Sequence, residues 1–324
     1  MRALLLLAFG GPRSLDEVEF LLTRLFRGRK PSPEQLERVK ERYRLIGGCS
    51  PLPEITSDQA EALEKELNAR GQPFRSYVGM RYCHPLIEET LKQIVRDGFH
   101  EIVAVPMTPF ESRASTGAYI EEVNKINDKL GGGISVSFVK GWHCHPLFME
   151  ALREKIEEGL TEFEPAVRRG VHLLFTAHSL PKSMIENDPY VKEIDESIRG
   201  VLERVEPLPW RLAFQSKGGG SEEWIGPEVE KVLEELASRK VPGVLLIPIG
   251  FVSDHIEILF DIDIALRKKA ESLGIVLKRT RSLNRSERFI EALASAVEES
   301  MKRVTPFHPS PLEGEGEGGG EVTR

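Results

Sequence analysis

The chain has 324 residues and carries 44 Lys and Arg against 51 Asp and Glu, which gives a formal net charge of −7. At roughly 150 residues per domain, this length predicts about two domains, each able to bury a hydrophobic core without disulfides. The acidic balance argues against nucleic-acid binding, which usually requires a basic face. The three cysteines are too few for a disulfide framework, so we expect a cytoplasmic location.

Two apolar segments near the N-terminus bear on membrane association. The run at residues 4–9 is too short for the core of a signal peptide, and no stretch of about 18 apolar residues is present to span a bilayer. Residues 20–26 (FLLTRLF) precede Arg27, Arg29 and Lys30, an apolar-then-basic pattern typical of helices on a membrane surface. A helix packed on its own domain is the favoured interpretation, and a peripheral membrane contact stays open.

Short apolar runs recur along the chain and predict β-strands. They occupy residues 3–9, 74–80, 101–107, 134–139, 171–176, 211–215, 244–249 and 275–279. Segments with helical periodicity lie between and after them, at residues 57–69, 85–97, 116–130, 147–160, 189–204, 227–238, 255–273 and 286–303. Strands that alternate with helices indicate the α/β class, with parallel sheets covered by helices on both faces.

A weak internal repeat favours two open four-stranded sheets over a single eight-stranded barrel. In the first half a strand ends, Pro85 opens a helix, and the next strand ends at Pro106. In the second half Pro227 and Pro248 occupy the corresponding places. Proline suits the first helical turn because its missing N–H would have no partner there. The barrel remains the alternative.

The domain boundary is expected near Gly141. Residues 1–141, together with a returning C-terminal helix at 286–303, would form the first domain, and residues 142–285 the second. Residues 304–324 are rich in Gly and Glu with almost nothing to bury, so they are expected to form a disordered tail.

Two residues that follow strands of the second half carry the sharpest chemical signal. Ligands of open parallel sheets bind beyond the carboxyl ends of the strands. His178 lies at such an end, and Ser253 or Asp254 can cap a helix whose start carries Glu257. Asp261, four residues further on, shares a helical face with Glu257. An imidazole and two carboxylates predict a divalent-metal or proton-transfer site, although an acidic helix start without further function is the alternative.

Other motifs exclude several enzyme classes. The glycines at 10–11 lack the G-x-G-x-x-G pattern of dinucleotide binding, and no G-x-S-x-G nucleophile motif is present. Three consecutive residues are of types that bind metal ions, namely His143, Cys144 and His145. However, residues at i and i+2 do not share one helical face, and no second pair completes a tetrahedral set of ligands. A loop with incidental histidines is therefore the favoured interpretation of that run.

Taken together, these motifs resemble those of the ferrochelatase family over about residues 2–302. The matching blocks are GGP at 10–12, RY at 42–43 with IGGCSPL at 46–52, RY at 81–82 with Pro85, AHSLP at 177–181 with DPY at 188–190, FQSK at 214–217 with WIGP at 224–227, PIGFVSDHIE at 248–257 and LN at 283–284. The resemblance implies insertion of Fe²⁺, as the substrate metal, into a porphyrin. It also implies two Rossmann-like, chelatase-type domains with the porphyrin in the cleft between them.

The resemblance assigns roles to the candidate residues. His178 and Glu257 would face the porphyrin centre and the incoming iron. Our hypothesis is that His178 accepts pyrrole protons and helps to position iron, while Glu257, backed by Asp261, handles metal entry or proton exit. The division of these roles stays open. The remaining candidates would wall the macrocycle or bind its propionates, with a purely structural role as the alternative for each. The wall candidates are Phe9, Tyr119, Trp224 and Phe251, and the propionate candidates are Arg42, Tyr43, Ser50, Arg81 and Tyr82.

Departures from the family pattern add further expectations. Cys49, Cys83 and Cys144 lack cluster spacing, so no iron–sulfur cluster is expected. Phe9 replaces a tyrosine found in several relatives, and the loop at residues 108–119 is atypical. Both differences leave the choice between protoporphyrin IX and coproporphyrin III open. The alternatives are a cobalt or nickel chelatase of another tetrapyrrole and a non-catalytic haem- or porphyrin-binding protein. A monomer or weak homodimer is expected.

Overall fold

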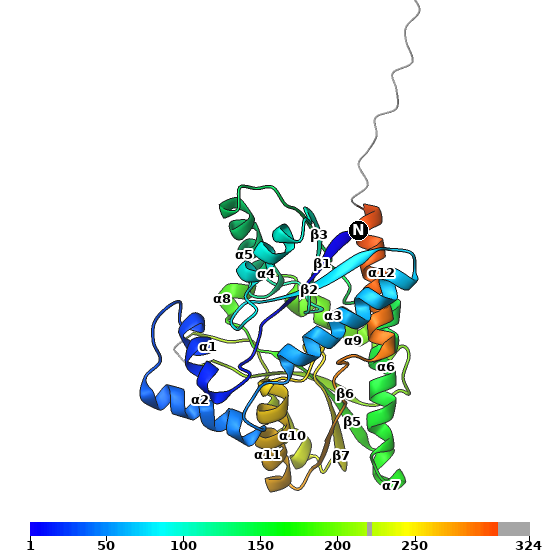
Figure 1. Ribbon diagram of the computed structural model, residues 1–324. Coiled ribbons are helices and arrows are strands. Elements are labelled where there is room, and N and C mark those ends of the chain that lie inside the picture. Colours follow the sequence, from blue (N-terminus) through cyan, green and yellow to red (C-terminus); the bar gives the residue numbers. More distant parts are fainter. Residues whose placement is uncertain (219–221, 304–324) are drawn as a thin grey trace, which may run out of the picture.

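The computed structural model describes residues 1–218 and 222–303 (Figure 1). Its first parallel sheet has the order β2-β1-β3-β4 and its second the order β6-β5-β7-β8, so the two sheets repeat one topology. The strands are β1 (Arg2–Ala8), β2 (Phe74–Met80), β3 (Glu101–Pro106), β4 (Ser135–Phe138), β5 (Val171–His178), β6 (Trp210–Gln215), β7 (Gly243–Ile247) and β8 (Val276–Arg279). The prediction of two four-stranded sheets is confirmed, and the barrel is excluded. The tail predicted at 304–324 lies outside the described residues.

Helices cover both sheets on both faces, as the alternation of strands and helices predicts. Most of them match expected segments, with ends shifted by a few residues. They are α1 (Val18–Leu25), α2 (Pro33–Leu45), α3 (Leu52–Ala69), α4 (Ile87–Arg96), α5 (Thr116–Lys129), α6 (Pro146–Thr161), α7 (Pro165–Arg168), α8 (Lys182–Ile185), α9 (Tyr190–Leu202), α10 (Val229–Ser238), η2 (Glu257–Leu266), α11 (Arg267–Ser272) and α12 (Glu287–Arg303), with a short 3₁₀ turn η1 (Leu15–Glu17).

Strand β1 shows why the sheets are buried on both sides. Leu4 and Leu6 point into a core shared with α3, whereas Leu5 and Leu7 point into a second core beneath α4 and α5. Successive residues of a strand face opposite sides of the sheet, so a run of leucines requires cover on both faces. The core that contains Leu4 also contains Phe175 of β5, so one continuous apolar core joins the two sheets.

The helix α2 is one that the periodicity did not predict. Its composition is mostly polar, and of its residues only Tyr43 is buried. The start is nevertheless encoded locally, because Ser32 and Gln35 form a capping box and Pro33 occupies the first turn. The helix carries Arg42 and Tyr43 to the second half of the chain.

The roles predicted for two prolines are wrong. Pro85 and Pro227 each lie two residues before a helix, which begins at Ile87 or Val229. Instead, the Pro85 carbonyl accepts a hydrogen bond from the Met80 N–H (2.8 Å), and the Pro227 carbonyl accepts one from the Phe214 N–H (2.8 Å). Each proline therefore pairs through its carbonyl with the edge strand of its own sheet. The two halves still repeat one another, but because of this pairing and not because the prolines begin helices.

The segment expected as one α-helix at 255–273 is divided. Residues Glu257–Leu266 form a π-helix, with hydrogen bonds to the fifth residue back, and α11 follows directly. Such segments are rare and occur often at functional sites. Glu257 and Asp261 still lie one turn apart, which keeps them near the same side of the helix.

The predicted helix cap by Ser253 or Asp254 is wrong, since the helix start has no side-chain cap. Ser253 Oγ accepts a hydrogen bond from Gln59 Nε2 (2.9 Å), and Asp254 accepts from Ser282 Oγ (2.6 Å) and Asn284 Nδ2 (2.8 Å). Both side chains thus form hydrogen bonds with distant segments of the chain instead of capping the helix.

The last helix, α12, runs beside α6 and α3 in Figure 1 and contacts both. Its Phe289 is fully buried, with its ring centroid 6.0 Å from Trp142 and 6.3 Å from Phe148. α12 therefore bridges a helix from each half of the chain. The domain division at Gly141 stays a prediction.

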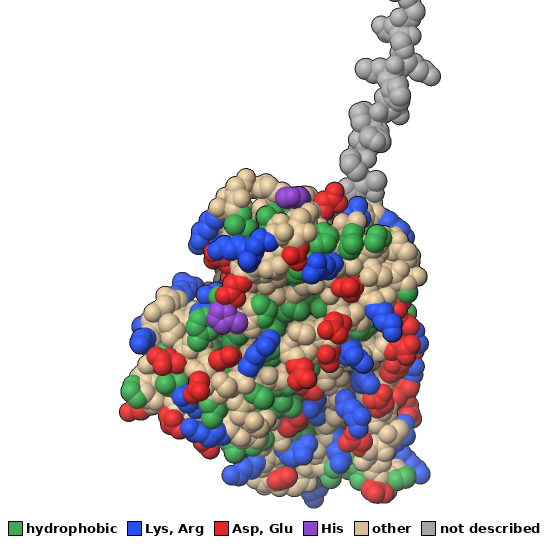
Figure 2. Space-filling view, in the orientation of Figure 1, with side chains coloured by type: hydrophobic (Ala, Val, Ile, Leu, Met, Phe, Trp, Pro, Cys, Tyr) green, Lys and Arg blue, Asp and Glu red, His purple; other side chains and the backbone are tan. Residues whose placement is uncertain are grey.

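The surface carries mixed charges. On the face in Figure 2, basic and acidic side chains are interspersed, and acidic ones gather along the edge formed by α6. In the described ranges, no helix combines the length and the apolar character needed to cross a bilayer.

The aromatic cluster around α12 yields a stability prediction. Phe289→Ala is expected to lower the free energy of unfolding by about 3–5 kcal/mol, because it leaves a cavity in a packed core. Urea unfolding followed by circular dichroism would measure the loss. Phe20→Ala, at a residue 37% exposed, is the matched control and should cost under about 1 kcal/mol. Equal losses in the two variants would contradict the bridging role of α12.

Candidate active site

The structure brings His178 and Glu257 together. His178 is the last residue of β5 and Glu257 the first of η2, and the His178 Nε2 atom lies 3.7 Å from Glu257 Oε2. Their side chains are 35% and 26% exposed, so both are open to a ligand. The pair sits beyond the carboxyl end of the central strand of the second sheet, where a parallel fold places its ligands.

One hydrogen bond fixes the tautomer of His178. The Nδ1 atom lies 2.6 Å from the carbonyl oxygen of Ser179. A carbonyl can only accept, so Nδ1 must carry the hydrogen, and in the neutral ring the lone pair is then on Nε2. That lone pair faces Glu257, and it can accept a proton or bind a metal ion.

Glu257 has a free position for a cation. Its Oε2 atom is buried, and it has no hydrogen-bond partner in the described part of the chain. Buried polar atoms are nearly always satisfied in folded proteins, so an unsatisfied carboxylate oxygen beside an imidazole is typical of a site that pairs with a ligand.

Asp261 lies one turn further along η2, and its side chain is 26% exposed, as is that of Glu257. Its Oδ2 accepts a hydrogen bond from Ser216 Oγ (3.0 Å), and its Oδ1 lies 3.6 Å from an Arg42 guanidinium nitrogen. Burial raises the pKa of Asp261, the charge of Glu257 raises it further, and Ser216 and Arg42 oppose the rise. Two carboxylates that repel one another favour a bound cation or proton.

Two buried tyrosines, Tyr43 and Tyr190, interact electrostatically with Glu257. Burial raises the pKa of the Tyr43 phenol and of the Tyr190 phenol, and the negative charge of Glu257 adds to both shifts. The Tyr190 hydroxyl donates a hydrogen bond to the His178 carbonyl (3.0 Å) and so holds the end of β5 in place. Sequence reasoning noted Tyr190 only as part of a motif and missed this contact.

The predicted wall residues differ in their exposure. Phe9 is 44% exposed, and its ring lies 4.5 Å from that of Tyr82, over which the Arg81 guanidinium lies at 5.2 Å. Tyr82 in turn packs on the cluster that contains Tyr43. These side chains form an aromatic and cationic surface next to α2.

Trp224 and Phe251 lie on the second half of the chain. Trp224 forms an antiparallel bridge with Pro181, three residues after His178, and its Nε1 is buried without a partner in the described ranges. The Phe251 ring contacts that of His255, with the centroids 4.5 Å apart and the ring planes tilted by 59°. Both rings therefore flank segments that carry the His178–Glu257 pair.

Tyr119 and Ser50 lie inside the protein. Tyr119 is 7% exposed and packs in the core with Leu5 and Leu7. Ser50 is also 7% exposed, and its Oγ accepts a hydrogen bond from the Leu52 N–H (3.3 Å). Internal packing thus occupies these two side chains, in contrast to the exposed ring of Phe9.

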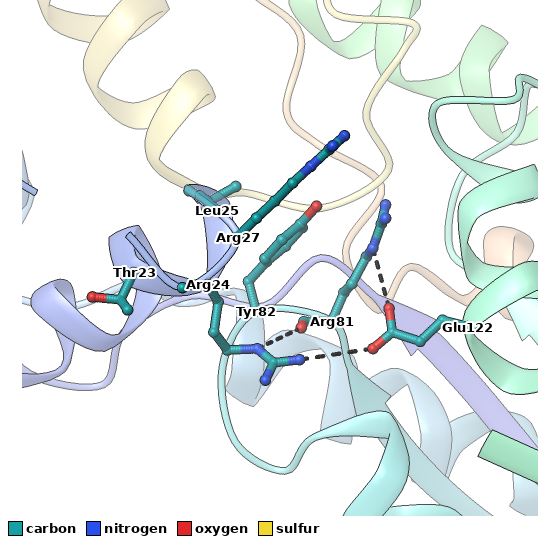
Figure 3. Close-up of a pocket in the computed structure, with 8 residues that line it drawn as sticks. Thr23, Arg24, Leu25, Arg27, Arg81, Tyr82 and Glu122 are labelled. Carbon is teal, nitrogen blue, oxygen red and sulfur yellow. Dashed lines mark hydrogen bonds and ion pairs between the residues drawn. The ribbon is translucent and has the colours of Figure 1, made fainter. Parts of the chain in front are cut away.

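A pocket of about 490 Å³ opens beside Arg81 and Tyr82 (Figure 3). Arg24 and Arg81 both reach Glu122, at 3.7 and 3.2 Å, and the Arg24 Nε donates to the Arg81 carbonyl at 3.1 Å. Burial raises the pKa of Glu122, and the two arginines oppose the rise. Arg27 and Tyr82 extend side by side towards the same opening in Figure 3. Sequence reasoning missed Arg24 and Glu122 because no local pattern links them.

The comparisons with known proteins agree with this geometry. A family model described as Ferrochelatase matches residues 1–301. The ferrochelatase of Herpetosiphon aurantiacus is 39% identical over 297 residues, which cover 91% of this chain and 97% of that protein. The coproporphyrin III ferrochelatase of Oceanobacillus iheyensis is 33% identical over 303 residues, with 92% and 96% coverage.

A solved structure shows the same fold. SirB from Bacillus subtilis, crystallised with Fe³⁺, superposes with a TM-score of 0.57 at 12% sequence identity, covering 93% of this chain and 96% of SirB. At that identity the likeness concerns the fold alone. Because the family model spans nearly the whole described chain and the relatives match almost end to end, the chain belongs to the ferrochelatase family, the lyases that insert Fe²⁺ into a porphyrin.

Proposed function

We propose that His178 and Glu257 carry out the insertion of Fe²⁺ into the porphyrin. The overall reaction exchanges the two pyrrole N–H protons of the free macrocycle for one iron ion. The chain must therefore remove two protons and guide a hydrated cation to the ring centre. The pair at 3.7 Å, with a lone pair on His178 Nε2 and an unsatisfied oxygen on Glu257, offers groups for both tasks.

The His178 imidazole accepts a pyrrole proton at Nε2. The bond from Nδ1–H to the Ser179 carbonyl persists when the ring becomes charged, so protonation requires no rotation of the side chain. The Tyr190 bond to the His178 carbonyl keeps the strand end fixed during this change.

Glu257 and Asp261 receive the cation or pass protons away. Oxygen ligands suit Fe²⁺ as well as imidazole does, and the row of two carboxylates leads from the pair towards Arg42 and Ser216. An approaching iron ion attracts both carboxylates, and this attraction outweighs the repulsion between them. This arrangement supports metal entry through Glu257, with Asp261 as the next carboxylate in line.

The substrate is protoporphyrin IX or coproporphyrin III, which differ in their number of propionates. Carboxylates bind arginine through charge-assisted hydrogen bonds, and Arg81, with Tyr82, faces the pocket beside Phe9. Arg42 is already paired with Asp261, and its guanidinium stacks on Phe260 at 5.0 Å. Arg81 is itself paired with Glu122 at 3.2 Å, but it lines the pocket beside Tyr82, so we propose Arg81 as the propionate anchor.

We further propose a cytoplasmic enzyme without an iron–sulfur cluster, active as a monomer or weak homodimer. Its cysteines are free thiols, with Cys83 buried and the other two exposed. A peripheral membrane contact would use the outer side of α1. There Phe20 is 37% exposed and lies close to Arg24, whereas Leu21 and Leu22 are buried against the protein.

Replacement of the proposed base tests the assignment directly. His178→Ala is expected to lower kcat for Fe²⁺ insertion on the order of 100-fold or more, with porphyrin affinity retained, because it removes the proton acceptor. Anaerobic absorbance assays with both porphyrins would measure the rate, and fluorescence quenching the affinity. His172→Ala, at the other end of β5, is the control and should keep the parental rate. A near-parental rate for His178→Ala would refute the proposal.

The charge of Glu257 has a separate expected effect. Glu257→Gln keeps the shape but removes the charge, so the KM for Fe²⁺ should rise roughly 10-fold or more with little change in porphyrin affinity. Glu271→Gln, at an exposed site on the following helix, provides the control. Assays with Co²⁺ and Ni²⁺ would show whether another metal is preferred. An unchanged KM in Glu257→Gln would argue against metal entry at this residue.

The anchor role of Arg81 predicts a defect in porphyrin binding. Arg81→Gln should raise the porphyrin KM about 10-fold with kcat preserved, because one charge-assisted bond contributes about 1.5–3 kcal/mol. Arg75→Gln removes an exposed arginine near the opposite end of β2 and should leave the KM unchanged. Comparison of the two porphyrins in both variants would show which substrate depends on Arg81. A defect in kcat alone would point to a structural role.

A further inference from the structure

A second group of metal-ligating side chains lies where the turn before α6 meets α9. His143 and Cys144 belong to the turn, and Glu196 projects from α9. One ligand atom from each residue lies within 4.8 Å of the other two, and His143 Nε2 is 3.1 Å from Glu196 Oε2. The sequence pattern argued against a site here because i and i+2 neighbours do not share a helical face. In the structure they lie in a turn, and the third side chain comes from a distant helix.

A carboxylate also lies behind the imidazole. Glu193 Oε2 is 3.5 Å from His143 Nδ1, on the opposite side of the ring from Glu196. A histidine that binds a metal through one nitrogen usually presents the other to a carboxylate or carbonyl, which fixes the ring and strengthens the donor. The side chains of His143 and Glu193 are only 13% and 11% exposed, so this arrangement is held within the protein.

Further hydrogen bonds hold Glu193 and the backbone of His143 in place. Glu193 Oε2 accepts a bond from the Glu111 N–H (2.6 Å), and Ser197 Oγ donates to the His143 carbonyl (2.5 Å). The turn and the helix are therefore fixed to one another before any ion binds. Such preorganisation lowers the entropic cost of binding a ligand.

The local charge favours a cation. The carboxylates of Glu193 and Glu196 both lie beside the His143 ring, at 3.5 and 3.1 Å from its two nitrogens. The positive group that faces Glu196 is Lys192, whose side chain is 78% exposed and lies 3.5 Å away. A flexible, exposed lysine can move aside at little cost, whereas the two acids and the thiol stay.

We propose that His143, Cys144 and Glu196 bind a divalent ion of the zinc class at a site separate from the insertion pair. One nitrogen, one sulfur and one oxygen donor suit Zn²⁺, Co²⁺ or Fe²⁺, whereas Mg²⁺ and Ca²⁺ prefer oxygen ligands alone. Water would complete the fourth position. Binding releases the thiol proton of Cys144, and the donor atoms must draw together by about 1 Å to reach tetrahedral spacing.

This inference does not depend on the proposed function. The insertion pair consists of an imidazole and carboxylates, whereas the second site includes a thiolate. A metal ion bound at the second site therefore has a spectroscopic signature of its own. The ion would also join the turn before α6 to α9, the helix whose first residue, Tyr190, contacts the His178 carbonyl.

Titration of the full chain with Co²⁺, without porphyrin, tests the site. We expect one equivalent of Co²⁺ to give thiolate-to-metal charge-transfer absorption. Cys144→Ser should abolish this absorption, and Glu196→Gln should weaken binding about 10-fold or more. Asp195→Asn, on the neighbouring position of α9, and His178→Ala should both retain it. Absence of the band, its survival in Cys144→Ser, or equal weakening in Asp195→Asn would overturn the proposal.

Thiol alkylation provides a second measurement that uses another cysteine as its control. Cys49 and Cys144 are both exposed. Zn²⁺ should slow the alkylation of Cys144 at least about 10-fold, as peptide mass spectrometry would show, and leave the rate at Cys49 unchanged. The protection should be lost in Glu196→Gln and kept in His178→Ala. Equal protection of both cysteines, or protection that persists in Glu196→Gln, would contradict a site at these three residues.

Discussion

The candidate active site depends on the hydrogen bond between His178 Nδ1 and the Ser179 carbonyl (2.6 Å). It determines which ring nitrogen is free, and it directs that nitrogen towards Glu257. The backbone geometry that presents the carbonyl follows from the end of β5, which Tyr190 secures through the neighbouring His178 carbonyl. The tautomer of His178 is thus fixed by a main-chain group, which substitutions of side chains alter little.

The position of Glu257 depends on contacts between the two halves of the chain. Gln59 of α3 is fully buried, and its amide donates to Ser253 Oγ (2.9 Å) and to the Asn284 carbonyl (2.8 Å). Arg42 of α2 reaches Asp261 and the ring of Phe260. These polar contacts join the first half to the segment before η2 and to η2 itself. Most of the burial around these polar contacts comes from the continuous apolar core between the sheets.

The errors of sequence reasoning have a common physical cause. Pro85 and Pro227 satisfy the rules for a helix start, and Ser253 and Asp254 satisfy those for a cap. Instead, residues distant in sequence bind the side chains of Ser253 and Asp254, and an N–H of an edge strand binds the carbonyl of each proline. The π-helix from Glu257 belongs to the same class, because its wider turn departs from the α-helical period.

The sequence by itself determined the alternation of strands and helices and the approximate position of each strand, and it identified His178 and Glu257 as candidates for the central pair. These features can be predicted because periodicity and turn chemistry are local properties of the chain, and because a motif is defined by the residues that are present. Only the tertiary structure decided the 3.7 Å separation of that pair, the tautomer of His178, and the meeting of Arg24 with Glu122. Each of these joins segments or groups whose approach depends on packing and backbone geometry, which no local pattern encodes.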